Sequence, residues 1–227
     1  MVMVSDITRE TARSARKGGV MVHVLLVEDQ RMARTLIENM IAEEEDFELA
    51  ASIANAAYAE LACRQHKVDL VLMDIYTELG TSGLDAAARI KSRFPHIKVI
   101  LLTSLAEYSF IERAKAAGAE SFWYKNLSTE SLISVMRRTM AGESIYPDKT
   151  PAVRLGNAVS TEFTARELEV LRLVVEGETD AAIADILGVS TSAVRFHINN
   201  MLQKTGYSSR TRLAVAAVNQ QLVVAGL

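Results

Sequence analysis

The sequence predicts two domains, a doubly wound parallel sheet of five strands and then a small domain built only of helices. Between residues 21 and 141, short apolar runs alternate with segments of helical spacing, which is typical of an α/β fold with a parallel sheet. Residues 142–161 contain proline and glycine and have no sustained periodicity, which indicates a linker. Residues 162–227 show helical spacing.

The first domain contains five apolar runs that are short enough to be buried strands. One helix stops before Pro95, because the residue that precedes proline resists helical geometry, and Gly118 can cap the next helix. The last helix is expected to open at Ser128, with Leu127 and Leu132 as a hydrophobic staple. The expected strands are 22–27, 47–53, 69–73, 97–102 and 121–124, and the expected earlier helices are 31–43, 56–65, 83–94 and 107–117.

Polar side chains follow these strands and are expected to meet at one edge of the sheet. In the flavodoxin-like strand order 2-1-3-4-5, the first and third strands flank the switch point, which brings Glu28, Asp29 and Asp74 together. Thr103 and Lys125 end the fourth and fifth strands at the same edge. Mg²⁺ prefers carboxylate oxygens, while lysine and threonine can bind phosphoryl oxygens. The sequence therefore predicts a phosphoryl-transfer site with an aspartate nucleophile.

Residues 21–141 resemble the receiver domain of two-component response regulators. The motifs that carry the resemblance are Leu-Leu-Val-Glu28-Asp29, Met73-Asp74, Leu102-Thr103-Ser104 and Gly118-Ala-Glu-Ser-Phe122-Trp-Tyr-Lys125. The resemblance implies that a sensor histidine kinase transfers a phosphoryl group to Asp74. It also implies that Asp29 binds Mg²⁺ directly, that Glu28 holds a metal-bound water, and that the backbone carbonyl of Tyr76 completes the metal site.

The same resemblance implies a conformational switch. Thr103 would turn toward the phosphoryl group, Phe122 would follow it inward, and Lys125 would pair with the phosphate. Phe122 stands three residues before Lys125, as the family pattern requires. A plain core aromatic is the alternative interpretation of Phe122.

The segment after Asp74 departs from the family pattern. Thr77 and Glu78 stand where the family usually has Met-Pro, and Gly83 lies nine residues after Asp74 where the family has a glycine at eight. Proline would restrict the backbone there, and its absence enlarges the set of conformations to be ordered. We therefore expect weak Mg²⁺ affinity and a loop over 75–82 that orders only when metal and phosphate are present.

The second domain has the arrangement of a helix-turn-helix unit. Thr164 and Glu167 are spaced as a capping box, with Phe163 and Leu168 as a staple. A short helix over 179–187, buried through Ile183, Ile186 and Leu187, is followed by a glycine turn and a longer helix over 191–204. A fourth helix is expected over 210–221.

One face of helix 191–204 is apolar and the other is suited to DNA. The DNA-facing set is Ser192, Arg195, Phe196, Asn199 and Gln203, with Lys204 at the end of the helix. Arginine can bind guanine or phosphate and an aromatic ring can meet a thymine methyl group, which predicts binding to double-stranded promoter DNA. His197 lies at the border of this face and is interpreted as structural.

Residues 163–217 resemble the LuxR-type DNA-binding domain. The matching text is Phe-Thr164-Ala-Arg-Glu167-Leu-Glu-Val-Leu, Val194-Arg195-Phe-His197 and Ser209-Arg210-Thr211. The two resemblances together imply a response regulator of the NarL/FixJ class, a phosphorylation-controlled transcription regulator. Basic and acidic residues balance over 163–217, so a single copy should bind DNA weakly and a homodimer is expected upon phosphorylation.

Composition sets the remaining bounds. The net charge of −3 gives no overall sign of nucleic-acid binding, so that prediction rests on the local motif. The single cysteine, Cys63, fits a reducing cytoplasm, and no apolar run approaches the length of a membrane span. Residues 1–20 lack the apolar core of a secretory signal and are expected to be a disordered extension.

Three alternative functions remain open at this stage. An aspartate-nucleophile phosphatase of the haloacid dehalogenase type would need a second aspartate where Tyr76 stands. A transcription factor that senses a diffusible ligand would need an apolar pocket, which the acidic cluster disfavours. A receiver that works without phosphorylation is favoured by the altered loop after Asp74. The chain does not reveal the promoter, the cognate kinase, or whether it activates or represses.

Overall fold

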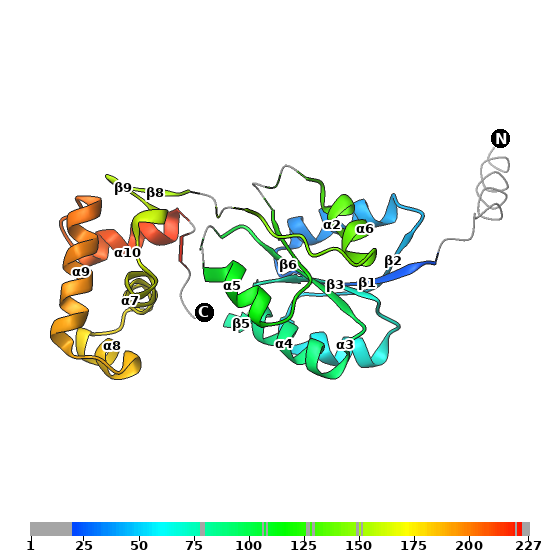
Figure 1. Ribbon diagram of the computed structural model, residues 1–227, viewed down its shortest axis with the longest axis horizontal. Coiled ribbons are helices and arrows are strands. Elements are labelled where there is room, and N and C mark those ends of the chain that lie inside the picture. Colours follow the sequence, from blue (N-terminus) through cyan, green and yellow to red (C-terminus); the bar gives the residue numbers. More distant parts are fainter. Residues whose placement is uncertain are drawn as a thin grey trace.

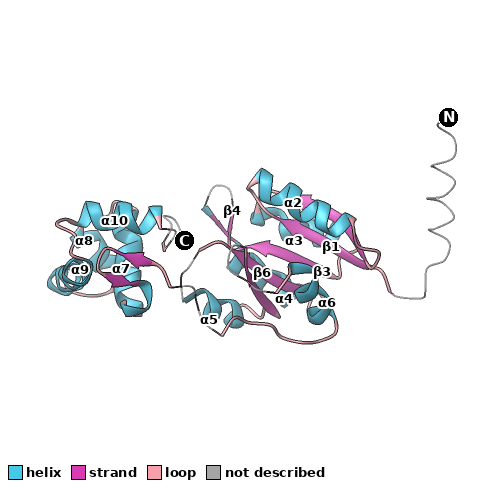
Figure 2. Ribbon diagram, turned by 90° about the horizontal axis from the view of Figure 1, so that it is seen from above, coloured by secondary structure: helices cyan, strands magenta, loops and turns pink. Residues whose placement is uncertain are grey.

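The computed structural model describes residues 20–77, 80–105, 107, 109–125, 128, 130–148, 150, 152–220 and 222–223. The chain forms two lobes that are joined by one connection (Figure 1). One lobe contains a central sheet, and the other is built mainly of helices (Figure 2). The predicted disordered extension falls almost entirely on residues outside the described part.

The sheet has the predicted topology. Five parallel strands, β1 (Val22–Val27), β2 (Phe47–Ile53), β3 (Leu70–Asp74), β6 (Lys98–Thr103) and β7 (Ser121–Tyr124), lie in the order β2-β1-β3-β6-β7. Strands β1, β3 and β6 occupy the interior of this order, and their apolar side chains, apart from the partly buried Val22, are buried on both faces. This explains why they read as continuous apolar runs rather than as an alternating pattern.

Helices cover both faces of the sheet (Figure 1). Leu25, Val71 and Leu101 belong to the core that packs against α3 (Ala59–Gln65), α4 (Gly83–Arg93) and α5 (Ser109–Ala116). Leu26 and Leu72, each the next residue along its strand, belong to the opposite core under α2 (Arg31–Ala42) and α6 (Leu132–Met140). Successive strand residues point to opposite faces, so one apolar run supplies both cores.

One expectation about these helices is wrong in detail. Helix α6 begins at Leu132, with Ser131 as the cap, and not at Ser128. The Ser128 hydroxyl instead accepts a hydrogen bond from the backbone amide of Tyr124, so Ser128 stabilises the turn after β7 and does not cap a helix. The proposed staple includes Leu127, which lies outside the described residues. In α2 the buried apolar residues are Ile37 and Ile41, whereas Met32 and Leu36 are exposed.

The segment predicted as a linker has two parts. Its first part lies along β7, where Phe122 N–H donates to the carbonyl of Ile145 at 2.8 Å and Ile145 N–H donates to the Ser121 hydroxyl at 3.1 Å. Its second part forms a hairpin of β8 (Arg154–Leu155) and β9 (Ala158–Val159), followed by the short helix η3 (Ser160–Glu162). Leu155 and Ala158 are fully buried in the core of the second lobe, so that core begins within the expected linker.

Four helices complete the second lobe. They are α7 (Ala165–Val175), α8 (Asp180–Leu187), α9 (Thr191–Thr205) and α10 (Arg210–Asn219). The predicted capping box is present, because Thr164 accepts from the Glu167 amide and the Glu167 side chain accepts from the Thr164 amide. Gly188 adopts a left-handed conformation between α8 and α9, as the helix-turn-helix pattern requires. The prediction that Ile186 is buried is wrong, since 59% of this residue is exposed.

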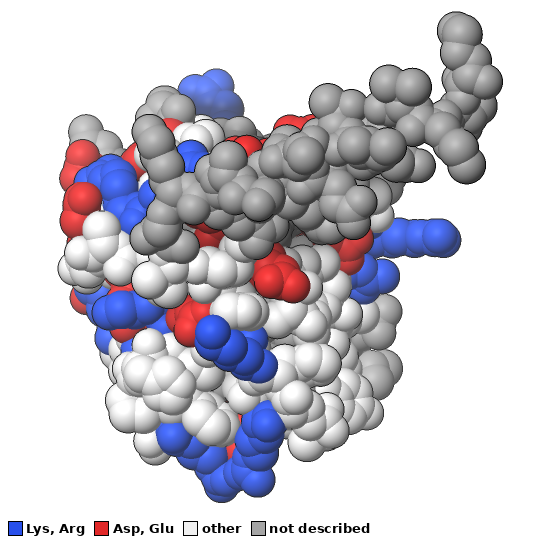
Figure 3. Space-filling view, turned by 90° about the vertical axis from the view of Figure 1, so that its right-hand side faces the viewer, with Lys and Arg blue, Asp and Glu red and all other residues white. Residues whose placement is uncertain are grey.

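At the end of the molecule opposite the second lobe, basic and acidic side chains are interspersed among uncharged ones where no undescribed residues cover the view (Figure 3). This fits the near-neutral charge balance of the chain. In the described part, no single helix is long and apolar enough to cross a membrane, and α8 with α9 meet that test only as a pair bent by 109°.

Candidate phosphorylation site and nucleic-acid interface

The structure brings the three predicted carboxylates together at the carboxyl ends of β1 and β3. Glu28, Asp29 and Asp74 each offer an oxygen within 4.8 Å of the others. Glu28 is fully buried and Asp74 is nearly so, while Asp29 is partly exposed. Strands β1 and β3 are neighbours in the sheet and both end at this edge, which is why residues so distant in sequence meet here.

Lys125 supplies the positive charge of this cluster. Its Nζ lies 2.6 Å from Asp74 Oδ2 and 2.5 Å from Glu28 Oε2, so one ammonium bridges two buried carboxylates. The backbone of Lys125 donates to the carbonyl of Thr103 at 2.8 Å, which fixes the chain as it leaves β7. Two buried negative charges are costly in a protein interior, and this pairing is what makes them tolerable.

The environment shifts the pKa of both partners. Burial raises the pKa of Asp74 to about 7; the charge of Lys125 opposes this rise and that of Glu28 adds to it. Burial alone would lower the pKa of Lys125, but the charges of Asp74 and Glu28 outweigh burial and raise it. A divalent cation at the carboxylates would favour the ionised form of Asp74 for the same electrostatic reason.

Thr103 and Phe122 lie where the receiver resemblance requires them. Thr103 ends β6 beside β3, is buried, and accepts a hydrogen bond from the Leu105 amide at 3.0 Å, which leaves its hydroxyl proton able to donate. Phe122 is buried and packs edge-on against Tyr124, with 4.9 Å between ring centroids. Phe122 is therefore in an inward position in this structure.

The loop after Asp74 makes contacts that the sequence did not predict. Strand β4 (Tyr76–Thr77) pairs with β5 (Thr81–Ser82) in an antiparallel hairpin, and Thr77 is fully buried. Gly83 N–H donates to the carbonyl of Ile75 at 2.8 Å, and a Cβ on Gly83 would lie 1.9 Å from the carbonyl oxygen of Asp74. Only glycine fits so close to that backbone, which accounts for its presence at the end of the loop. Glu78 lies outside the described residues.

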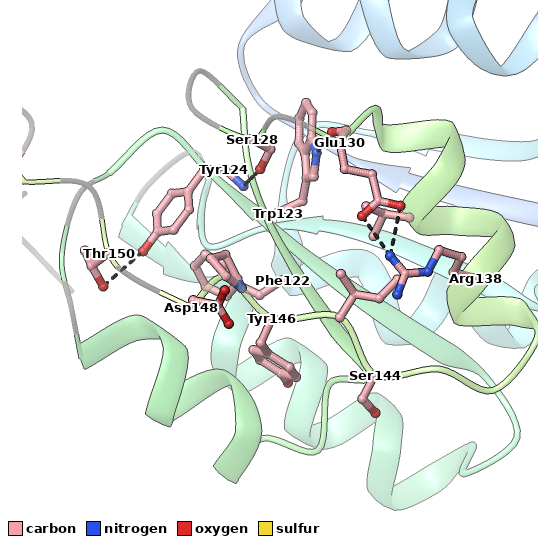
Figure 4. A pocket seen from close by; sticks show the side chains of 13 residues that line it. Phe122, Trp123, Tyr124, Ser128, Glu130, Arg138, Ser144, Tyr146, Asp148 and Thr150 are labelled. Carbon is pink, nitrogen blue, oxygen red and sulfur yellow. Dashed lines mark hydrogen bonds and ion pairs between the residues drawn. The ribbon is translucent and has the colours of Figure 1, made fainter.

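A pocket of about 620 Å³ opens beside Phe122, between β7, α6 and the connection to the second lobe (Figure 4). Phe122, Tyr124 and Tyr146 line it, and the Tyr124 hydroxyl reaches Thr150 at 3.5 Å. Tyr146 donates to the carbonyl of Ala119 at 2.6 Å, which holds the connection against the receiver. The residue expected to switch is therefore in direct contact with the chain that leads to the second lobe.

The exposed face of α9 carries the residues predicted to bind DNA. Val194, Ile198 and Met201 are buried. The residues that were predicted to face DNA and are exposed are Ser192, Arg195, Phe196, Asn199 and Gln203. In both Figure 1 and Figure 2, α9 lies on the side of its lobe away from the receiver. Phe196 is 61% exposed and contacts the His197 ring edge-on at 5.7 Å.

Acidic partners hold three of the basic residues in this region. Asp180, the first residue of α8, accepts from Arg195 Nε at 3.2 Å and from Arg210 Nη1 at 2.6 Å. Lys204 donates to both carboxylate oxygens of Glu167, at 2.7 and 2.9 Å. Lys204 thus has a structural role at the base of α7, and it could bind a phosphate only by leaving that carboxylate.

A charge pair joins the two lobes. Glu107, which lies in the loop after β6, is 1% exposed and pairs with Arg172 of α7. Arg172 also donates to the Ser109 hydroxyl at 3.1 Å. Sequence reasoning missed this pair, as it missed Asp180 and Thr77, because nothing in the spacing of single polar residues shows which distant segment they meet.

Comparisons with known proteins agree with this arrangement. The response regulator receiver domain matches residues 24–137, and the luxR family of bacterial regulatory proteins matches residues 161–217. Response regulator protein VraR of Staphylococcus aureus is 30% identical over 208 residues, which cover 89% of this chain and 99% of VraR.

Solved structures share the fold at lower identity. RcsB of Salmonella enterica serovar Typhimurium, bound to promoter rprA in the presence of phosphomimetic BeF₃⁻, has a TM-score of 0.56 and 18% identity, covering 86% of this chain and 97% of that one. A LuxR-family response regulator from Aurantimonas sp. SI85-9A1 has a TM-score of 0.52 and 22% identity, covering 58% and 91%. The two family matches and the relation to VraR show that the chain belongs to the two-component response regulators that join a receiver to a luxR-type DNA-binding domain, a family of transcription regulators rather than of enzymes.

Proposed function

We propose that this chain is a cytoplasmic transcription regulator that is switched by phosphorylation of Asp74. A sensor histidine kinase supplies the phosphoryl group, and the second lobe binds promoter DNA. The observation that carries the proposal is the contact of one buried ammonium, that of Lys125, with the carboxylates of both Asp74 and Glu28. A cation held at the nucleophile is placed to neutralise an incoming phosphoryl group.

The placement of these side chains supports the following transfer step. A carboxylate oxygen of Asp74 attacks phosphorus, an acyl phosphate forms, and the bond from phosphorus to the histidine nitrogen of the kinase breaks. The departing imidazole takes up a proton. Lys125 pairs with a phosphoryl oxygen, and the Thr103 hydroxyl donates to another, which draws Thr103 toward the new group.

The donor set fits Mg²⁺. Asp29 and Asp74 offer carboxylate oxygens, Glu28 can hold a metal-bound water, and the Tyr76 carbonyl is the fourth expected group. When bound, the ion neutralises negative charge on the transferring phosphoryl group.

Intact mass spectrometry tests the proposal. Incubation with acetyl phosphate and Mg²⁺ should add about one phosphoryl group per chain, and Asp74→Asn should abolish this addition. Asp69→Asn is the matched control, because Asp69 lies just before the opposite end of β3, where it accepts a bond from His23. That variant should be labelled like the wild type. A label that persists in Asp74→Asn would refute the assignment, and unlabelled wild-type protein that still binds its promoter would favour regulation without phosphorylation.

Phosphorylation is further proposed to pair two chains on an inverted-repeat site. A two-fold pair of helix-turn-helix units matches half-sites about one helical turn apart or a multiple of it. Because charges balance in the DNA-binding domain, a single copy gains little from phosphate contacts. Sedimentation should show a dimer only after phosphorylation; a phosphorylated monomer that binds one half-site equally well would contradict this part.

A further inference from the structure

Thr77 links the loop that follows Asp74 to a distant part of the receiver. Its hydroxyl accepts a hydrogen bond from the Ala56 amide at 3.0 Å and donates one to the carbonyl of Thr81 at 3.2 Å. Ala56 begins the short helix η1 (Ala56–Tyr58), which follows β2, and Thr81 belongs to β5. One fully buried hydroxyl thus joins three segments.

The position of Thr77 gives these bonds a consequence for the metal site. The carbonyl of Tyr76 and the amide of Thr77 belong to the same planar peptide group, so fixing Thr77 also fixes the direction of that carbonyl. The amide of Tyr76 lies 3.4 Å from Asp74 Oδ1, which holds the other side of Tyr76 close to the nucleophile. Gly83 closes the loop against the backbone of Asp74 and Ile75.

We propose that Thr77 is a positioning residue for Mg²⁺, which holds the Tyr76 carbonyl in the direction needed for binding before the ion arrives. This inference rests on the proposed function. The buried hydroxyl would restrict the loop backbone near the position where the family pattern has a proline. A loop that is already held in place loses less conformational freedom when the ion binds than the unrestrained loop that the sequence predicted.

Two substitutions separate the hydroxyl from the shape of the side chain. Thr77→Val keeps the volume and removes both hydrogen bonds, whereas Thr77→Ser keeps the hydroxyl. In the full chain, titration calorimetry should show Mg²⁺ affinity about 10-fold weaker or more in Thr77→Val, the effect typical of groups that orient a metal ligand. Thr77→Ser should recover most of it. Hydrogen exchange in metal-free protein should be faster at the amides of 75–77 and 80–83 in Thr77→Val.

Thr139→Val is the control for general loss of stability. The Thr139 hydroxyl is buried and pairs with Ser121 at 2.7 Å, between α6 and β7 and not in the loop. It should lower the unfolding temperature while leaving Mg²⁺ affinity and loop exchange unchanged. The inference is overturned if Thr77→Val binds Mg²⁺ as tightly as the wild type, or if Thr139→Val weakens binding equally. Wild-type protein that binds no Mg²⁺ and accepts no phosphoryl group would instead refute the proposed function.

Discussion

At the phosphorylation site the charged side chains are buried and paired with one another, whereas on the outer side of α9 they are exposed and few. The Lys125 side chain is 10% exposed, but that of Arg195 is 69% exposed. Charges in the first region determine both stability and chemistry, because removal of Lys125 would leave two buried carboxylates without their shared cation. Charges in the second region can change with little effect on the fold, which leaves them free to determine DNA preference.

The largest expected effect is on stability and tests this contrast directly. Lys125→Met leaves Glu28 and Asp74 without their shared cation, so the free energy of unfolding should fall by about 3–5 kcal/mol in metal-free protein. Arg195→Ala, the exposed counterpart, should cost less than about 1 kcal/mol. Urea unfolding at neutral pH measures both. Equal losses would mean that the carboxylate cluster does not depend on Lys125, and added Mg²⁺ should restore part of the loss in Lys125→Met.

The pH dependence of stability should reveal the buried acid. In the folded state the pKa of Asp74 is raised from 3.8 to about 7, so its contribution is present at acid pH and is lost as the pH rises between these values. Asp74→Asn should therefore stabilise metal-free protein at pH 8 by on the order of 2–4 kcal/mol.

Asp69 provides a control of opposite sign for that experiment. Burial works against ionisation of Asp69, but the hydrogen bonds from His23 outweigh burial and lower its pKa. Its contribution is present above the unfolded-state value and is lost as the pH falls through the folded-state value. Asp69→Asn should accordingly destabilise the protein at pH 8. If Asp74→Asn destabilised the protein at pH 8 as Asp69→Asn does, the raised pKa of Asp74 would be wrong.

On the DNA side, Arg195→Ala should weaken binding to a preferred DNA by about 1–3 kcal/mol and relax the preference at the position that it contacts. Fluorescence anisotropy on selected DNA and on its single-base variants measures both. Arg166→Ala is a matched control in the same domain, since Arg166 pairs with Glu169 and the carbonyl of Leu187 and does not belong to α9. An equal loss of affinity on every DNA sequence would mean that Arg195 contacts only a phosphate and no base.

The same contrast explains what the sequence could and could not predict. The strand order and the meeting of Glu28, Asp29, Asp74 and Lys125 followed from apolar runs that end at one sheet edge, because the geometry of a parallel sheet leaves little choice. The exposed set on α9 followed from helical periodicity.

Contacts made by single polar side chains were not predictable in this way. Thr77 reads as a polar loop residue in the sequence, yet it is fully buried and held by two hydrogen bonds. Ser128 and Ser131 are equally good helix caps, and only the turn after β7 decides between them. The exposure of Ile186 depends on how α8 packs against its neighbours, which local spacing does not specify.

The Glu107–Arg172 pair between the lobes is expected to behave in a way that lies between the buried phosphorylation site and the exposed face of α9. Arg172→Ala removes the cationic partner of buried Glu107, which keeps its hydrogen bond from the Ser109 hydroxyl, and we expect the lobes to separate and expose that carboxylate to water. The stability loss should therefore stay near 1 kcal/mol or below, as for solvated pairs. Small-angle scattering should show a larger radius of gyration than the wild type. A loss as large as that of Lys125→Met, without expansion, would show that the lobes cannot separate.

The smallest expected effect concerns Asp180, which holds Arg195 and Arg210 beside the DNA face. DNA phosphates should be repelled by this carboxylate and should compete with it for both arginines. Asp180→Asn should strengthen binding to all sequences by less than about 1 kcal/mol, and the dependence of affinity on salt should steepen by about one counterion.

Asp185→Asn is the control for Asp180, because it removes one charge from the same helix while leaving the contact of Asp180 with both arginines in place. If the two variants strengthen binding equally, only net charge matters. If Asp180→Asn weakens binding to the preferred DNA alone, the carboxylate orients Arg195 for a base and does not compete with phosphate. In that case a charge in the exposed region would be held in position by its partner, as Lys125 is at the buried site.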